Sequence, residues 1–139
     1  MIPVAIVDDG EADRYLVKRR LARSGKFEEL IEFSSGDRFL DEFSNGVASV
    51  YTGNLPLLIL MDINMPGRDG FQTIEELSLL VRESGRPDNT LILMYTSSLN
   101  IRDQERAKEL SIIKGYLAKP MRNDSVERME QIYRACCAA

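Results

Sequence analysis

The stretch LLILMDINMPGRDG, residues 57–70, contains the change from apolar to polar residues on which the fold prediction rests. Five apolar residues, Leu57–Met61, run without a break into Asp62, and a Pro66-Gly67 pair typical of turns follows. Continuous apolar runs of this length are typical of strands that are buried on both faces of a parallel sheet. The stretch therefore predicts a buried strand with a carboxylate at its carboxyl end.

Further apolar runs repeat this form along the chain. They cover residues 4–7, 91–95 and 116–118, and a weaker run with more charges, residues 28–33, is expected at a sheet edge. Polar stretches with helical spacing begin near residues 11, 34, 69, 100 and 124, and residues 53–56 and 84–89 are expected to be loops. This alternation of strand and helix predicts an α/β fold, a three-layer sandwich of helix, parallel sheet and helix.

Length and composition exclude several classes of protein function. A chain of 139 residues with 44% hydrophobic residues is expected to form one domain, residues 1–139, with no separate output domain. The net charge of −4 provides no basic surface for nucleic acid, and the apolar runs fall short of the roughly 20 residues that span a bilayer. The chain has no histidine, and Cys136 and Cys137 are adjacent, which fits a cytoplasmic protein without distant disulfides.

Polar residues follow each of the predicted central strands. Asp8 and Asp9 follow the first strand, Asp62 the third, Thr96 the fourth and Lys119 the fifth. Ligands of open parallel sheets bind outside the carboxyl ends of the strands, so these side chains are expected to meet there. Crowded carboxylates repel one another unless a cation is present, and oxygen ligands favour Mg²⁺ or a similar hard ion such as Mn²⁺. The set predicts a site for phosphoryl transfer.

A set of motifs, taken in their order along the chain, resembles the receiver domain of two-component response regulators. They are Asp8-Asp9, the segment from Met61 to Gly70, Thr96, and Tyr116-Leu117-Ala118-Lys119-Pro120. The resemblance extends from Ile2 to about Tyr133, and the ordered set is much more specific than any one motif. It implies a five-stranded parallel sheet in the order 2-1-3-4-5, the flavodoxin-like receiver fold.

The resemblance also implies a role for each acidic residue. Asp62 is expected to be the phosphoacceptor, and Asp9 a direct ligand of Mg²⁺. Asp8 is expected to act on the ion mostly through water, and Asn64 to offer its backbone carbonyl. The protein is then a signalling phosphoprotein that carries a 4-aspartylphosphate, and not an enzyme with a separate substrate.

Three further residues match the family's switch and charge positions. Lys119 is expected to pair first with the acceptor carboxylate and later with a phosphoryl oxygen. Thr96 is expected to hydrogen-bond the phosphoryl group, and its inward movement to make room for the switch aromatic Tyr116. Ser98, together with Asn64, is expected to influence hydrolysis of the phosphorylated aspartate, and the short Ser98 side chain to shield it only modestly.

The resemblance implies protein partners. Since the chain contains no histidine, the phosphohistidine donor must be another protein, a sensor histidine kinase or a histidine phosphotransfer protein. Output is expected to pass to a downstream protein target or by onward phosphoryl transfer. No nucleic-acid or membrane partner is expected, and the protein is expected to be a monomer or a weak homodimer.

The sequence leaves three alternative functions open. A pseudo-receiver would keep the fold but act only as a protein-interaction module. A phosphohydrolase of the haloacid dehalogenase type typically needs an aspartate two residues after the nucleophile, where this chain has Asn64. A flavodoxin-like electron carrier would need a loop rich in hydroxyl groups and glycine after the first strand, where Asp8 and Asp9 would repel the flavin phosphate.

Overall fold

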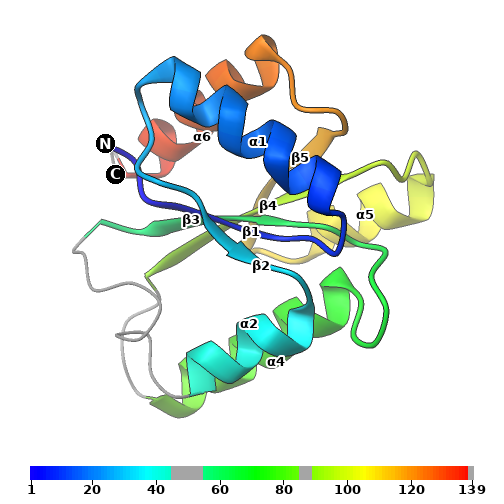
Figure 1. The fold of residues 1–139 in the computed structure, drawn as a ribbon. Coiled ribbons are helices and arrows are strands. Elements are labelled where there is room, and N and C mark those ends of the chain that lie inside the picture. Colours follow the sequence, from blue (N-terminus) through cyan, green and yellow to red (C-terminus); the bar gives the residue numbers. More distant parts are fainter. Residues whose placement is uncertain (45–54, 85–88, 138–139) are drawn as a thin grey trace.

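The computed structural model describes residues 1–44, 55–84 and 89–137. Residues 45–54, 85–88 and 138–139, which include residues 53–54 and 85–88 of the two loops expected from the sequence, lie outside this part. Strands and helices alternate along the chain (Figure 1). They are β1 (Val4–Val7), α1 (Glu11–Ser24), β2 (Ile31–Phe33), α2 (Gly36–Ser44), β3 (Leu57–Met61), α4 (Gly70–Ser84), β4 (Thr90–Thr96), α5 (Ile101–Glu109), β5 (Ile113–Ala118) and α6 (Asn123–Cys137).

The strands form one parallel sheet in the order β2-β1-β3-β4-β5. This confirms the predicted fold class and strand order. β2 is shorter than the run from which it was predicted and begins only at Ile31, because the exposed Glu28 and Glu29 do not suit a buried strand. As expected, this charged segment lies at a sheet edge, and β5 forms the opposite edge.

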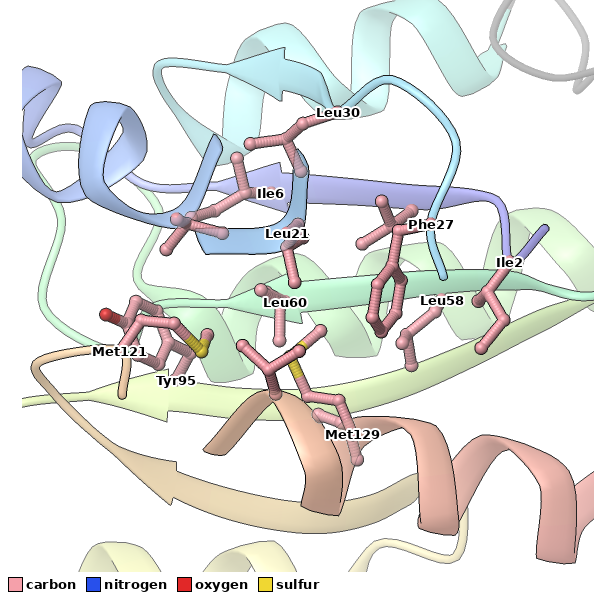
Figure 2. Close-up of a cluster of buried hydrophobic side chains, with 14 of the residues drawn as sticks. Ile2, Ile6, Leu21, Phe27, Leu30, Leu58, Leu60, Tyr95, Met121 and Met129 are labelled. Atoms are coloured by element: carbon pink, nitrogen blue, oxygen red, sulfur yellow. The ribbon is translucent and has the colours of Figure 1, made fainter. Parts of the chain in front are cut away.

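Helices cover both faces of the sheet (Figure 1). α1 and α6 pack on one face, and α2, α4 and α5 pack on the other. Figure 2 shows the first of these layers, in which Leu21 of α1 and Met129 of α6 lie over Leu58 and Leu60 of the central strand. Successive side chains of a strand point to opposite faces, so a continuous apolar run supplies both cores at once.

Three backbone hydrogen bonds extend the strand pairing just past the carboxyl ends of the strands. The Asp8 N–H donates to the Phe33 carbonyl, the Asp62 N–H to the Val7 carbonyl, and the Lys119 N–H to the Thr96 carbonyl, each at 3.0 Å. These bonds fix where the chain leaves each strand. The residues after β1, β3 and β5 are therefore held at a common edge of the sheet.

Side-chain caps mark the starts of α4 and α5. Asp69 and Gln72 form a reciprocal capping box at the start of α4, with hydrogen bonds of 2.8 and 2.9 Å. The Asn100 side chain accepts from the Arg102 N–H at 2.9 Å at the start of α5. α1 begins after Gly10 without a side-chain cap. Among the described residues, no helix has the length and apolar character needed to cross a membrane.

Candidate functional site

Three carboxylates meet at the carboxyl edge of the sheet. Asp8 and Asp9 follow β1, Asp62 follows the adjacent β3, and one oxygen from each lies within 4.8 Å of the others. Asp8 and Asp62 are buried, whereas Asp9 is exposed. A hard divalent cation prefers oxygen ligands of this kind and would relieve the repulsion among them. The cluster therefore fits a Mg²⁺ site, as the sequence predicted.

Lys119 brings a positive charge to this cluster from β5. Its Nζ lies 2.7 Å from Asp8 Oδ2, 2.9 Å from Asp13 Oδ2 and 3.4 Å from Asp62 Oδ2. The ammonium group also lies 5.6 Å from the centre of the buried Tyr95 ring, within the range of a cation–π interaction. The predicted pairing of Lys119 with Asp62 is present, but it is the longest of the three contacts.

Burial and charge shift the two central pKa values. Burial raises the pKa of Asp62 above 3.8, and the Asp8 carboxylate raises it further, while Lys119 and the Thr96 hydroxyl partly oppose this. Burial alone would lower the pKa of Lys119, but hydrogen bonds with Asp8 and Asp13 outweigh this effect and raise it. Lys119 is therefore positively charged at neutral pH.

A hydrogen-bonded network links Thr96 to Tyr116 through Ser98. The Ser98 N–H donates to Thr96 Oγ1 at 3.2 Å, and the Tyr116 hydroxyl donates to the Ser98 carbonyl at 2.9 Å. The Ser98 hydroxyl donates to Asp103 Oδ2 at 2.8 Å. Thr96 is fully buried and Tyr116 half-buried. The structure thus brings together the predicted hydroxyl and the predicted switch aromatic.

The start of α4 packs closely behind Asp62. A Cβ atom on Gly70 would lie 2.2 Å from the Asp62 carbonyl oxygen, so only glycine permits this approach. The Gly70 N–H donates to the Ile63 carbonyl at 2.8 Å. Asn64 lies between these segments with an exposed side chain. The loop after β3 is therefore held against the start of α4.

A family model for the response regulator receiver domain matches residues 4–130. The chain belongs to the response regulator receiver family. No curated protein matches the sequence of this receiver. Among solved structures, it is similar to a two-component response regulator from Cytophaga hutchinsonii, with 22% identity, a TM-score of 0.76 and coverage of 97% of this chain and 98% of that one.

Two other solved structures agree with this assignment. A response regulator receiver domain protein from Methanospirillum hungatei has 26% identity and a TM-score of 0.67, with coverage of 99% of this chain and 98% of that one. A bacteriophytochrome response regulator has 26% identity and a TM-score of 0.73, with coverage of 96% and 78%. The match to a receiver model gives no support to the phosphohydrolase and flavin-carrier alternatives.

Besides Asp103, two residues next to the acidic cluster of this receiver were not predicted from the sequence. Asp13 contacts Lys119, and the Arg14 guanidinium donates to the Asp8 carbonyl at 2.6 Å while pairing with Glu32 at 3.2 Å. Both residues lie in α1, a short distance beyond the acidic pair. The one available signal was spacing, because Asp13 lies four residues after Asp9, about one helical turn.

Proposed function

We propose that this receiver accepts a phosphoryl group on Asp62 from the phosphohistidine of a histidine kinase or histidine phosphotransfer protein, in a Mg²⁺-dependent step. The observation that carries the proposal is the position of Asp62, a buried carboxylate within 4.8 Å of Asp8 and Asp9 oxygens and 3.4 Å from the Lys119 ammonium. A carboxylate in such a site can act as a nucleophile towards phosphorus.

The proposed transfer exchanges one bond to phosphorus for another. An Asp62 carboxylate oxygen attacks the phosphorus atom, an O–P bond forms, and the N–P bond of the donor phosphohistidine breaks. The donor imidazole leaves with the bonding electron pair and takes up a proton. Phosphoryl transfer is largely positioning and electrostatic stabilisation, so the chain contributes by seating a cation at the acidic cluster and by placing Lys119 and Thr96 beside Asp62.

The acidic pair is proposed to hold the cation in two different ways. Asp9 is exposed and has no hydrogen bond or ion pair with the other described residues, so its carboxylate is available as a direct ligand. Asp8 already accepts from the Gly10 N–H at 2.8 Å and pairs with Lys119, which supports a contact through water. Asn64 is proposed to add its backbone carbonyl. When bound, Mg²⁺, or Mn²⁺ in its place, neutralises negative charge on the phosphoryl oxygens.

Lys119 and Thr96 are proposed to bind the transferred group. Lys119 has Asp62 within reach at 3.4 Å, and Thr96 Oγ1 accepts from the Ser98 N–H, so the threonine proton is directed at Asp62 and can be donated to a phosphoryl oxygen there. Charge-assisted hydrogen bonds contribute about 1.5–3 kcal/mol each. Two of them approach the roughly 5.5 kcal/mol that moves a population from 1:99 to 99:1.

The signal is proposed to leave the site through Ser98. If phosphorylation draws Thr96 towards the phosphoryl group, the Ser98 amide loses its acceptor. Because the Ser98 carbonyl accepts from the Tyr116 hydroxyl, a movement of the Ser98 backbone is passed on to Tyr116. The surface formed by α5, β5 and α6 then changes for a downstream protein, or the phosphoryl group passes on to another protein. We propose that residues 1–139 act in the cytoplasm as one receiver unit, a monomer or weak homodimer, without nucleic-acid or membrane partners.

The test is phosphoryl transfer from a radiolabelled histidine-phosphorylated kinase domain, with and without Mg²⁺. The wild-type protein is expected to become labelled only with Mg²⁺, and Asp62→Asn is expected to remain unlabelled. Asp124→Asn is the matched control, because it removes an exposed aspartate of α6 that has no hydrogen bond or ion pair with the described site residues, and it is expected to be labelled like wild type. Folded wild-type protein that no donor labels would refute the proposal and favour the pseudo-receiver alternative.

A further inference from the structure

Asp13 places a carboxylate beside Lys119 from the first turn of α1. Its Oδ2 accepts a hydrogen bond from Lys119 Nζ at 2.9 Å, which is shorter than the 3.4 Å contact between Lys119 and the proposed phosphoacceptor Asp62. The Lys119 side chain is 10% exposed and the Asp13 side chain 41% exposed. The ammonium is thus largely withdrawn from water, whereas Asp13 approaches it from the solvent side.

Gly10 allows this approach. A Cβ atom at position 10 would lie 2.8 Å from Asp13 Oδ2 and 3.2 Å from Asp8 Oδ1, so a larger residue would push against both carboxylates. The Gly10 backbone has φ −85° and ψ 108°, a conformation that any residue adopts, so the backbone angles do not require glycine. The close packing of Asp13 beside Asp8 accounts for the glycine instead.

The Lys119 ammonium donates hydrogen bonds to Asp13 and Asp62 and forms an ion pair with Asp8. An ammonium group has three N–H donors, and three carboxylates surround this one. Asp8 and Asp62 also belong to the acidic cluster that fits a cation, whereas Asp13 does not. A cation or a phosphoryl group at the cluster changes the charge that Asp8 and Asp62 present to Lys119. The contact with Asp13 is the one that such an event leaves intact.

We infer that Asp13 is a positioning residue that anchors the Lys119 ammonium beside Asp62 while Asp8 and Asp62 are engaged with a cation or a phosphoryl group. The role in phosphorylation rests on the proposed function, whereas the anchoring of the ammonium does not. Asp13 touches neither the cation nor the phosphoryl group, and it acts only through Lys119.

First-turn acids of a helix also interact favourably with the helix dipole, and this general effect must be separated from anchoring. Glu11 provides the matched control, because it is the other acidic residue in the first turn of α1, is exposed, and has no contact with Lys119 in the described part of the chain. Glu11→Gln therefore removes the same charge from the same helix end. A difference between the Asp13 and Glu11 variants reports the contact with Lys119.

The first measurement is NMR of the lysine ammonium group in uniformly ¹⁵N-labelled protein with saturating Mg²⁺. An ammonium signal is observed when hydrogen bonds slow its exchange with water, and its assignment follows from its loss in Lys119→Arg. The signal is expected in wild type, Glu11→Gln and Asp13→Glu, and is expected to be lost in Asp13→Ala. A signal that persists unchanged in Asp13→Ala would overturn the inference, whether or not the protein can be phosphorylated.

The second measurement is the rate of phosphoryl incorporation from the same kinase donor at saturating Mg²⁺. Asp13→Ala is expected to lower the rate about tenfold, the ratio that corresponds to one of the weaker charge-assisted hydrogen bonds. In the Lys119→Ala background, Asp13→Ala is expected to change the residual rate less than about twofold, because the partner is gone. An equal loss in both backgrounds would contradict positioning through Lys119, and an unlabelled wild type would count against the proposed function alone.

Discussion

The groups around Asp62 shift its pKa in opposite directions. Burial and the Asp8 carboxylate raise its pKa, while Lys119 and Thr96 lower it, and the net effect is an increase above 3.8. A carboxyl group with a raised pKa binds its proton more tightly in the folded state than in the unfolded state. Its contribution to stability is therefore present below the unfolded pKa and is lost as the pH rises through the folded pKa.

This dependence of stability on pH leads to a prediction for Asp62→Asn in metal-free protein. At neutral pH the variant is expected to be more stable than wild type, because it no longer carries a desolvated charge next to Asp8. Below pH 3.8 the difference is expected to disappear, because the unfolded wild type is then protonated as well. Urea unfolding in the presence of a chelator across this pH range measures the effect. A variant less stable than wild type at neutral pH would show that the contact with Lys119 dominates.

The residue types in the sequence predicted which residues form the site better than they predicted which side chains contact one another. The residue types after each strand indicated Asp8, Asp9, Asp62, Thr96 and Lys119, and the structure brings all of them to one edge. Asp13 was missed because its contact with Lys119 depends on how α1 is rotated against the sheet. Ser98 was considered only for its size, whereas its hydroxyl is bonded to Asp103 at 2.8 Å. Side-chain direction in loops depends on such tertiary partners.

At the element scale, the start of α4 is tied to the end of β3. The capping box of Asp69 and Gln72 fixes where the helix begins, and Gly70 lets its first turn lie against the Asp62 backbone. A helix that began elsewhere, or that stood further away, would change the direction of the loop carrying Asn64. The geometry of the acidic cluster therefore depends on this junction.

We expect Gly70→Ala to destabilise the protein by about 1–3 kcal/mol, the usual cost of overpacking a closely packed site. The new Cβ would meet backbone atoms of Asp62, which cannot move without shifting β3. Gly115→Ala is the matched control, because its Cβ would meet only methyl groups of Leu93 and Ile132, at 3.0 Å. Denaturant unfolding of both variants measures the difference. Equal losses would show that the Gly70 contact carries no special constraint.

Elements with strong patterns were predicted best. The runs that became β1, β3 and β4 are buried along most of their length, and burial on both faces is what produces a continuous apolar pattern. The edge strands were less well delimited, since β2 is shorter and β5 longer than their predicted runs. An edge strand is stabilised by one neighbour and by partial burial, so its ends are set by pairing that the sequence pattern does not display.

At the scale of the whole molecule, the sheet brings residues that are far apart in the sequence together in one charged site. Strand alternation predicted the layers, but the order 2-1-3-4-5 came from the family resemblance, because periodicity does not specify which strands are neighbours. That order places β1 beside β3 and so brings Asp8 and Asp62 together. The acidic cluster is a property of the folded chain, so a ligand that binds it should stabilise the fold.

Mg²⁺ is therefore expected to stabilise the wild-type protein against unfolding. At a concentration of 100 times the dissociation constant, binding to the folded state alone contributes about 2.7 kcal/mol. Asp9→Asn is expected to lose most of this gain, because it removes an exposed cluster carboxylate that is proposed as a direct ligand, and Glu11→Gln is expected to retain it. Thermal unfolding at constant ionic strength separates binding from screening. Equal stabilisation of the two variants by Mg²⁺ would argue against a cation site at the cluster.

Mapping the modified residue shows directly whether Asp62 accepts the phosphoryl group. The protein is incubated with a phosphorylated histidine kinase and Mg²⁺, then treated with borohydride, which reduces an acyl phosphate on aspartate to homoserine, and its peptides are sequenced by mass spectrometry. We expect reduction at position 62 alone, with Asp8, Asp9 and Asp13 unchanged. A stable phosphorylated state without reduction at position 62, or reduction at another aspartate, would contradict this expectation.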